Sequence, residues 1–238
     1  MRAQFILSMK WIFFLITLVI VSAVPSAAYA TDDECVFESR FNELAEQQGT
    51  TAELGLRHEI LAAVTSCALE EVETVQKNLD DLLIVDEELR TARTRFIDRL
   101  NEAHEYYATQ QETIADLGLR GTKSLAATLL ERRNELYTPL LNRTVHFIIW
   151  MKNQDLFEVA EDRSRQINQT IATLKLIGNT NIQFLFEEST AHFQRAQRAN
   201  QVAGQVFRVS DTPDDSPSLI RKSLEELAAT YQSFFELS

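Results

Sequence analysis

Glycine and proline, the two residues that end helices and form tight turns, are scarce in this chain of 238 residues. After residue 30, glycine occurs only at positions 49, 55, 118, 121, 178 and 204, and proline only at positions 139, 213 and 217. Strands need frequent turns, which leave many such residues between them, whereas helices do not. The chain is therefore predicted to be mostly helical.

The same few residues divide the chain into predicted helices. Thr50 and Glu53 have the spacing of a capping box, and Thr122 can cap a further start. Pro217 is suited to the first turn of a last helix. The resulting helical segments run over about 33–48, 50–117, 122–177 and 181–209, with a last one after the proline.

A seven-residue repeat of apolar side chains runs through the segment 50–117. Its first row is Leu61, Ala68, Val75, Leu82, Leu89, Phe96, Ala103 and Leu117. A second row, four residues on, is interrupted by Asp86 and Arg93. Such a repeat is typical of a long helix packed along a partner, and unbroken it would approach ~100 Å. The interruptions leave open a break near Asp86.

Pro139 lies inside the predicted segment 122–177. A proline within a helix removes one backbone donor and clashes with the preceding turn. We therefore expect a kink or a break near Tyr137, and whether the helix continues through it stays open at this point.

The densest apolar run after residue 30 follows this proline. Its members of interest are Val145, His146, Phe147, Ile149, Trp150 and Met151. The run is too short to cross a bilayer and would be apolar on every side of a helix. It is predicted to lie in the middle of the core. The alternatives are an exposed surface for a partner or a ligand contact near His146 and Trp150.

The end of the chain contains two further patterns. Small residues at Ala196, Ala199 and Ala203 form a row that allows close approach of another helix. Residues 31–209 are predicted to form the helical bundle, and 210–217 an acidic linker. Residues 218–238 then form an amphipathic helix, which we expect to dock on the bundle because its polar face lacks the excess of lysine and arginine that membrane-surface helices carry.

The two cysteines, Cys35 and Cys67, lie equally far in sequence from residue 51, beside the turn predicted at Gly49. In an antiparallel helical hairpin, residues symmetric about the turn lie side by side, which is the proximity that a disulfide needs. We therefore predict a disulfide between them. The alternative is a pair of buried thiols.

The first 30 residues resemble an export signal in composition. Arg2 and Lys10 precede an apolar stretch from Trp11 to Val21, and Ala28-Tyr29-Ala30 has the small residues of a cleavage site. Residues 1–30 are predicted to be a cleaved signal peptide, which places the protein outside the cytoplasm, secreted, periplasmic or at the cell surface. The alternative is an uncleaved helix that anchors it in a membrane.

The charge of the chain limits its partners. The formal net charge is -12, and removal of the two cations in residues 1–30 brings it to about -14. An acidic chain without a basic stripe is not expected to bind nucleic acid. Acidity favours solubility, or a face that attracts a basic partner. Membrane contact is expected only through residues 1–30, if they stay uncleaved.

Catalytic and metal-binding patterns are incomplete. His58-Glu59 and His104-Glu105 begin like a zinc-peptidase helix, but the second histidine is replaced by Ala62 or Ala108. Glu188 and His192 share a helix face, yet two side chains are too few ligands for a metal. We expect no enzyme activity, no metal and no cofactor.

The sequence thus predicts an all-α protein, an elongated antiparallel bundle of four to five helices in hairpins that resemble coiled coils. The function expected of it is that of an exported, non-enzymatic structural or interaction protein, which binds a protein partner or its own copies through helical faces. The alternative is an extracytoplasmic sensor or carrier that holds a small ligand between helices.

Overall fold

The computed structural model describes residues 38–49, 51–176, 178–209 and 216–237. These residues are nearly all helical and contain no strand, so the all-α prediction is confirmed. The chain divides into two compact units at Ile149 and Trp150. We call them the α3–α6 unit and the α7–α9 unit. The predicted signal peptide 1–30, Cys35 and most of the linker 210–217 lie outside the described residues.

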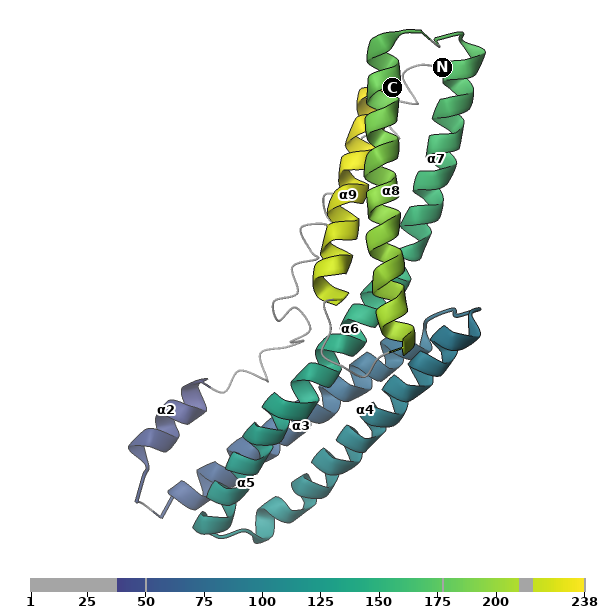
Figure 1. Cartoon of the computed structure of the whole chain (residues 1–238). Coiled ribbons are helices and arrows are strands. Elements are labelled where there is room, and N and C mark those ends of the chain that lie inside the picture. Colours follow the sequence, from purple (N-terminus) through teal and green to yellow (C-terminus); the bar gives the residue numbers. More distant parts are fainter. Residues whose placement is uncertain (1–37, 50, 177, 210–215, 238) are drawn as a thin grey trace. The chain divides into compact units, whose positions relative to one another are not determined.

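The α3–α6 unit is built around a helical hairpin. Helices α3 (Glu53–Asp80) and α4 (Glu87–Thr113) lie side by side and antiparallel (Figure 1). The Gln76 side chain donates to that of Asn101 across the pair. Helices α5 (Leu119–Arg132) and α6 (Thr138–Lys152) complete the bundle, and the Phe147 ring of α6 stacks 5.3 Å from that of Phe96. The short α2 (Glu38–Glu46) precedes α3.

The segment 50–117 is not one helix but two, which answers the question that the sequence left open. The chain leaves the helix after Asp80 and starts the next one at Glu87. The Asp86 carboxylate accepts from the backbone N–H of Leu89, which satisfies an orphan donor of the new helix. The break falls at one of the two interruptions of the apolar rows.

Pro139 distorts the helix without ending it. A π-helical turn, η3, spans Arg133–Tyr137 directly before α6, and the Thr138 N–H bonds to the Arg133 carbonyl in that wider spacing. A wider turn separates the proline ring from the carbonyls that it would otherwise meet. The distortion lies where the sequence predicted it. A further break at Asn153, between α6 and α7, was not predicted.

Two helix starts differ from the predicted caps. Helix α3 begins after Ala52, and Thr50 lies outside the described residues. The Glu53 carboxylate accepts from the Gly49 N–H at 2.8 Å, a bond that, together with Arg57, holds the pKa of Glu53 below its usual range. Thr122 is not a cap, because α5 starts after Gly118 and the Thr122 hydroxyl donates to the Leu119 carbonyl inside that helix.

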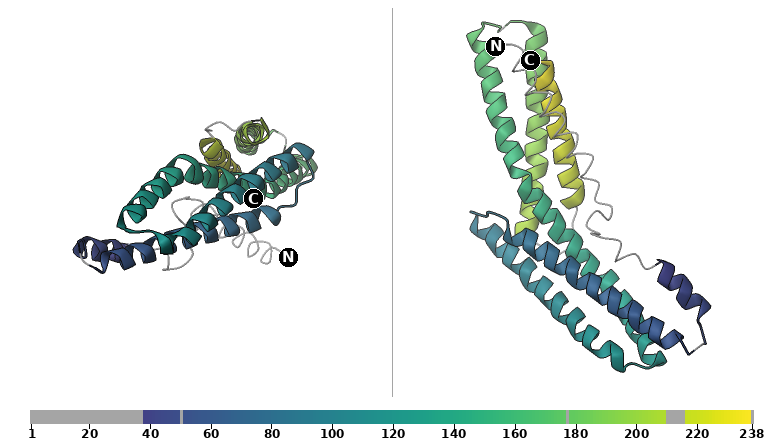
Figure 2. Two further views of the ribbon diagram at one scale, coloured as in Figure 1. Left: turned by 90° about the horizontal axis from the view of Figure 1, so that it is seen from below. Right: turned by 180° about the vertical axis from the view of Figure 1, so that it is seen from behind.

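The α7–α9 unit consists of α7 (Gln154–Thr173), α8 (Thr180–Val209) and α9 (Ser216–Glu236). Figures 1 and 2 show α9 lying along α8. Small residues are buried on both helices: Ala196, Ala199, Ala203 and Gly204 on α8, and Ser223, Thr230 and Ser233 on α9. Ala196 belongs to a buried cluster that also contains Leu227 of α9 and Ala160 of α7, whereas Gly204 faces the Trp150 indole. The C-terminal helix therefore packs along α8 within this unit.

Candidate functional site

The apolar run around Trp150 is part of the protein interior. Phe147, Ile148 and Trp150 are buried, whereas Val145, His146, Ile149 and Met151 are half-buried. The indole Nε1 of Trp150 donates to the Asn200 carbonyl at 3.0 Å, and its ring lies 5.7 Å from that of Phe207. A Cβ at Gly204 would lie 2.5 Å from the indole. Protein groups thus pack against the Trp150 indole.

A second buried cluster lies in the α3–α6 unit. The Tyr137 hydroxyl donates to the Ala68 carbonyl at 2.8 Å, and the Glu71 carboxylate lies 3.2 Å away. The Tyr107 ring packs edge-on against Tyr137, and burial raises the pKa of Tyr107 to about 12. Both phenols therefore stay neutral at physiological pH. Tyr137 joins α3 to the π-helical turn, which is a structural task.

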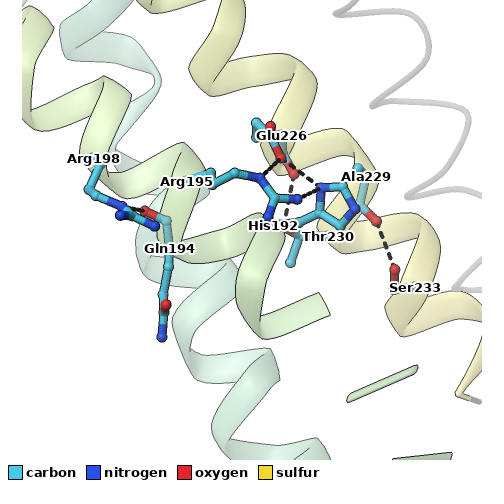
Figure 3. Close-up of polar contacts among 8 residues, drawn as sticks. All are labelled: His192, Gln194, Arg195, Arg198, Glu226, Ala229, Thr230 and Ser233. Atoms are coloured by element: carbon cyan, nitrogen blue, oxygen red, sulfur yellow. Dashed lines mark hydrogen bonds and ion pairs between the residues drawn. The ribbon is translucent and has the colours of Figure 1, made fainter. Parts of the chain in front are cut away.

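A shallow cavity of about 520 Å³ lies along α8 and α9. Its lining residues are His192, Ser218, Arg221, Lys222, Glu225, Glu226 and Ala229. His192 was considered as a metal ligand with Glu188, but the structure pairs it with Glu226, on the other helix (Figure 3). The described residues contain no group of three histidine, cysteine or acidic side chains that could hold a metal ion.

The Glu226 carboxylate is the centre of this cluster. It lies 2.6 Å from Nδ1 of His192 and accepts from Nε of Arg195 at 2.9 Å. Arg195 also lies 2.8 Å from that Nδ1, which cannot donate and accept at once, so we assign its proton to the shorter contact with Glu226. Burial would raise the pKa of Glu226, but the bonds from His192 and Arg195 outweigh it and lower that pKa. The cluster ties α8 to α9.

The loop between α3 and α4 presents apolar side chains to solvent. Leu82 is buried, but Leu83 is 94% exposed and Val85 is 92% exposed. Residues 82–86, which contain these side chains, have no regular secondary structure. The exposed residues that flank the pair are acidic: Asp80, Asp81, Asp86, Glu87 and Glu88. We call residues 80–88 the acidic turn.

The turn between α7 and α8 also exposes apolar side chains, in a different electrostatic setting. Leu174 and Phe184 are each 61% exposed. No acidic residue occurs from Arg163 to Phe186, and Lys175 is exposed at the turn itself. We call residues 174–176 and 178–186 the lysine turn. Sequence reasoning singled out the exposed apolar side chains of neither turn, because a pattern of residues does not reveal which apolar side chains remain uncovered.

Comparisons with family models, with curated proteins and with solved structures found no match to this chain. Within the described ranges, no helix is long and apolar enough to cross a membrane.

Proposed function

We propose that this chain is an exported, non-enzymatic protein that acts by binding another protein through its helical hairpins. The observation that carries the proposal is the acidic turn, where Leu83 and Val85 are almost wholly exposed. When a partner covers these two aliphatic side chains, the free energy falls by about 25 cal/mol per Å² of apolar surface removed from water. A scaffold that holds them outward is suited to recognition.

The acidic residues around Leu83 and Val85 define the kind of partner. Their charges favour a protein whose apolar groove is bordered by lysine and arginine, because complementary charges steer association and exclude wrong partners. The same charges disfavour an anionic lipid surface and a second copy of this turn. A basic-bordered groove on another protein is therefore the partner that we propose.

Export and the disulfide belong to the same proposal. Cys67 is buried in α3. Gly49 precedes this helix, and its φ of 78° suits a reversal of the chain. A bond to Cys35 would close a loop and stabilise the fold by about 3 to 4 kcal/mol in the chain-entropy model. Such a bond persists in the oxidising compartments outside the cytoplasm. N-terminal sequencing of the purified protein tests the export step, and Thr31 is the expected first residue.

A ligand carrier built around His146 and Trp150 is not carried forward. The side of the indole where a ligand would bind is occupied by Gly204, Phe207 and the Asn200 carbonyl. The cavity along α8 and α9 is shallow and has ion-paired residues in its wall.

A variant with Leu83→Ser and Val85→Ser tests the binding proposal. Wild-type protein extracted from its own cells is expected to elute from a sizing column in a complex larger than the protein alone, and the double variant is expected to elute alone. The matched control carries serine at Leu130 and Leu136, which are exposed apolar residues of the same unit. Equal loss of the complex in both variants, or no complex in wild type, would contradict the proposal.

A further inference from the structure

The lysine turn combines exposed apolar side chains with a near absence of charge. Its two well exposed apolar residues are Leu174, directly after α7, and Phe184, on the first turns of α8. Half-buried Leu176, Ile182, Leu185 and Phe186 adjoin them. Such a set of aliphatic and aromatic side chains, at the end of a hairpin, has no cover within the described residues.

Lysine is the only charged residue over a long stretch around this turn. Between Gln166 and Phe186, Lys175 carries the sole charge. The first carboxylates beyond it are Glu187 and Glu188, and the former lies roughly 10 Å along α8 from its start at Thr180. In a chain of formal charge -12, this stretch of sequence contains one cation and no carboxylate.

The backbone at Lys175 provides a second, independent observation. Helix α7 ends in a Schellman motif, in which Leu176 N–H bonds to the Ile171 carbonyl and Lys175 N–H bonds to that of Ala172. This motif requires a left-handed residue, for which glycine is favoured, yet Lys175 occupies it with a φ of 54°. The sequence thus places an ammonium group at the turn against the backbone preference. Strain of this kind occurs at binding sites.

We propose that the lysine turn contacts the surface of a lipid bilayer that contains anionic headgroups. Leu174 and Phe184 enter the boundary between headgroups and acyl chains, and the Lys175 ammonium reaches the phosphates. The contact adds to the protein-binding role and does not depend on it. It also differs from the expectation that only residues 1–30 meet a membrane.

Other occupants fit the turn less well. A second copy of the chain brings the same lone lysine to this surface and no carboxylate of the stretch to pair with it, so like charges meet. A nucleic acid would need a row of cations, and this surface has one. A lipid surface gains from each apolar side chain that enters it, and one lysine beside anionic headgroups adds about 1 kcal/mol.

A fluorescent amino acid that reports polarity, placed at Phe184 in the full chain, tests the proposal. We expect a blue shift with phosphatidylcholine vesicles that contain phosphatidylglycerol, and quenching by lipids that carry nitroxide groups. The matched control has the same label at Leu83, in the acidic turn, and should show neither. This local readout separates the turn from any binding by residues 1–30. No shift at position 184, or equal shifts at both positions, would overturn the proposal.

Lys175→Gly separates a role in binding from a role in folding. Glycine relieves the left-handed strain, so the variant should unfold at the same temperature or higher. Its partition to the anionic vesicles should nevertheless fall about fivefold, because one lysine near such a surface contributes about that factor. Partition to pure phosphatidylcholine should not change. A shift of the label that grows with protein concentration, without vesicles, would identify self-association and reject the lipid proposal.

Discussion

The acidic turn and the lysine turn both expose apolar side chains, but they differ in the charges beside them. Each joins two antiparallel helices and leaves aliphatic or aromatic side chains uncovered. Five exposed carboxylates surround the first, whereas a single lysine accompanies the second. Exposed apolar surface alone does not indicate what will cover it. We propose that the surrounding charges determine the kind of partner, a basic protein groove for the first turn and an anionic bilayer for the second.

The largest predicted effect is on binding to anionic vesicles, when carboxylates of the acidic turn are replaced by lysine. Lysine at Asp80, Asp81 and Glu88 would give the acidic turn the cations that it lacks, while Asp86 still caps α4. With the fluorescent label at position 83, partition of this turn to anionic vesicles should increase by on the order of a hundredfold, since each lysine contributes about 1 kcal/mol. The unmodified labelled chain is the control. An unchanged signal would mean that charge does not distinguish the turns.

The two units should respond oppositely to the same substitution of glycine by alanine. Gly204→Ala forces a Cβ to 2.5 Å from the Trp150 ring, so it should destabilise the protein by about 2 kcal/mol. Gly55→Ala is the control, because a Cβ there meets nothing within 4 Å and α3 gains a better helix former. Urea unfolding measures both. A stable Gly204→Ala variant would show that the indole can move away.

The backbone differs between the turns, because Asp86 caps a helix in one and Lys175 is left-handed in the other. A single substitution at each should change the free energy of unfolding in opposite directions. Asp86→Ala removes the cap of α4 and should cost about 1 kcal/mol. Lys175→Gly relieves a left-handed residue and should gain about 1 kcal/mol. Thermal unfolding of the two variants beside wild type provides the measurement. Changes of the same sign would contradict the distinction.

Acid should weaken both units for the same reason, with the smallest effect of the series. Glu53 in one unit and Glu226 in the other have folded-state pKa values below the ordinary 4.5. A lowered pKa stabilises the fold above the unfolded-state value, and this stabilisation disappears as pH falls through the folded-state value. Glu226→Gln should therefore lower the urea midpoint at pH 7 and approach wild type as pH falls below 4.5.

The exposed Glu161 provides a control for this titration. A Glu161→Gln variant should follow wild type over the whole range. A gap between Glu226→Gln and wild type that stays constant from pH 7 into acid would show that packing, and not the carboxylate charge, causes the loss.

Much of the helical organisation could be predicted from the chain. Glycine at 178 lies in the connection between α7 and α8, and proline at 217 lies in the first turn of α9, because their backbone preferences act locally. The end of α7 was predicted too late, because Lys175 and not a glycine takes the left-handed position there. The distortion before Pro139 follows from the same kind of local constraint. The break at Asp86 was visible as an interruption but not decided by it, since a polar residue in an apolar row is also tolerated by an imperfect bundle.

The candidate site could not be predicted in the same way. His192 pairs with Glu226, 34 residues away. Sequence reasoning considered Glu188 instead, because it shares a helix face with His192. Leu83 and Val85 belong to an apolar run that also contains buried Leu82 and half-buried Ile84, so composition does not separate them. Exposure depends on how the helices pack, which is a property of the fold and not of the local sequence.

A photo-reactive amino acid at position 83 tests the central claim most directly. Irradiation of living cells that export the labelled chain should crosslink it to a protein. The yield of this adduct should fall when Val85 is changed to Ser or when the salt concentration is raised. The same group at Leu130, an exposed leucine of α5, serves as the matched position and should give no such adduct. Adducts of equal yield at both positions, or none at position 83, would contradict the account.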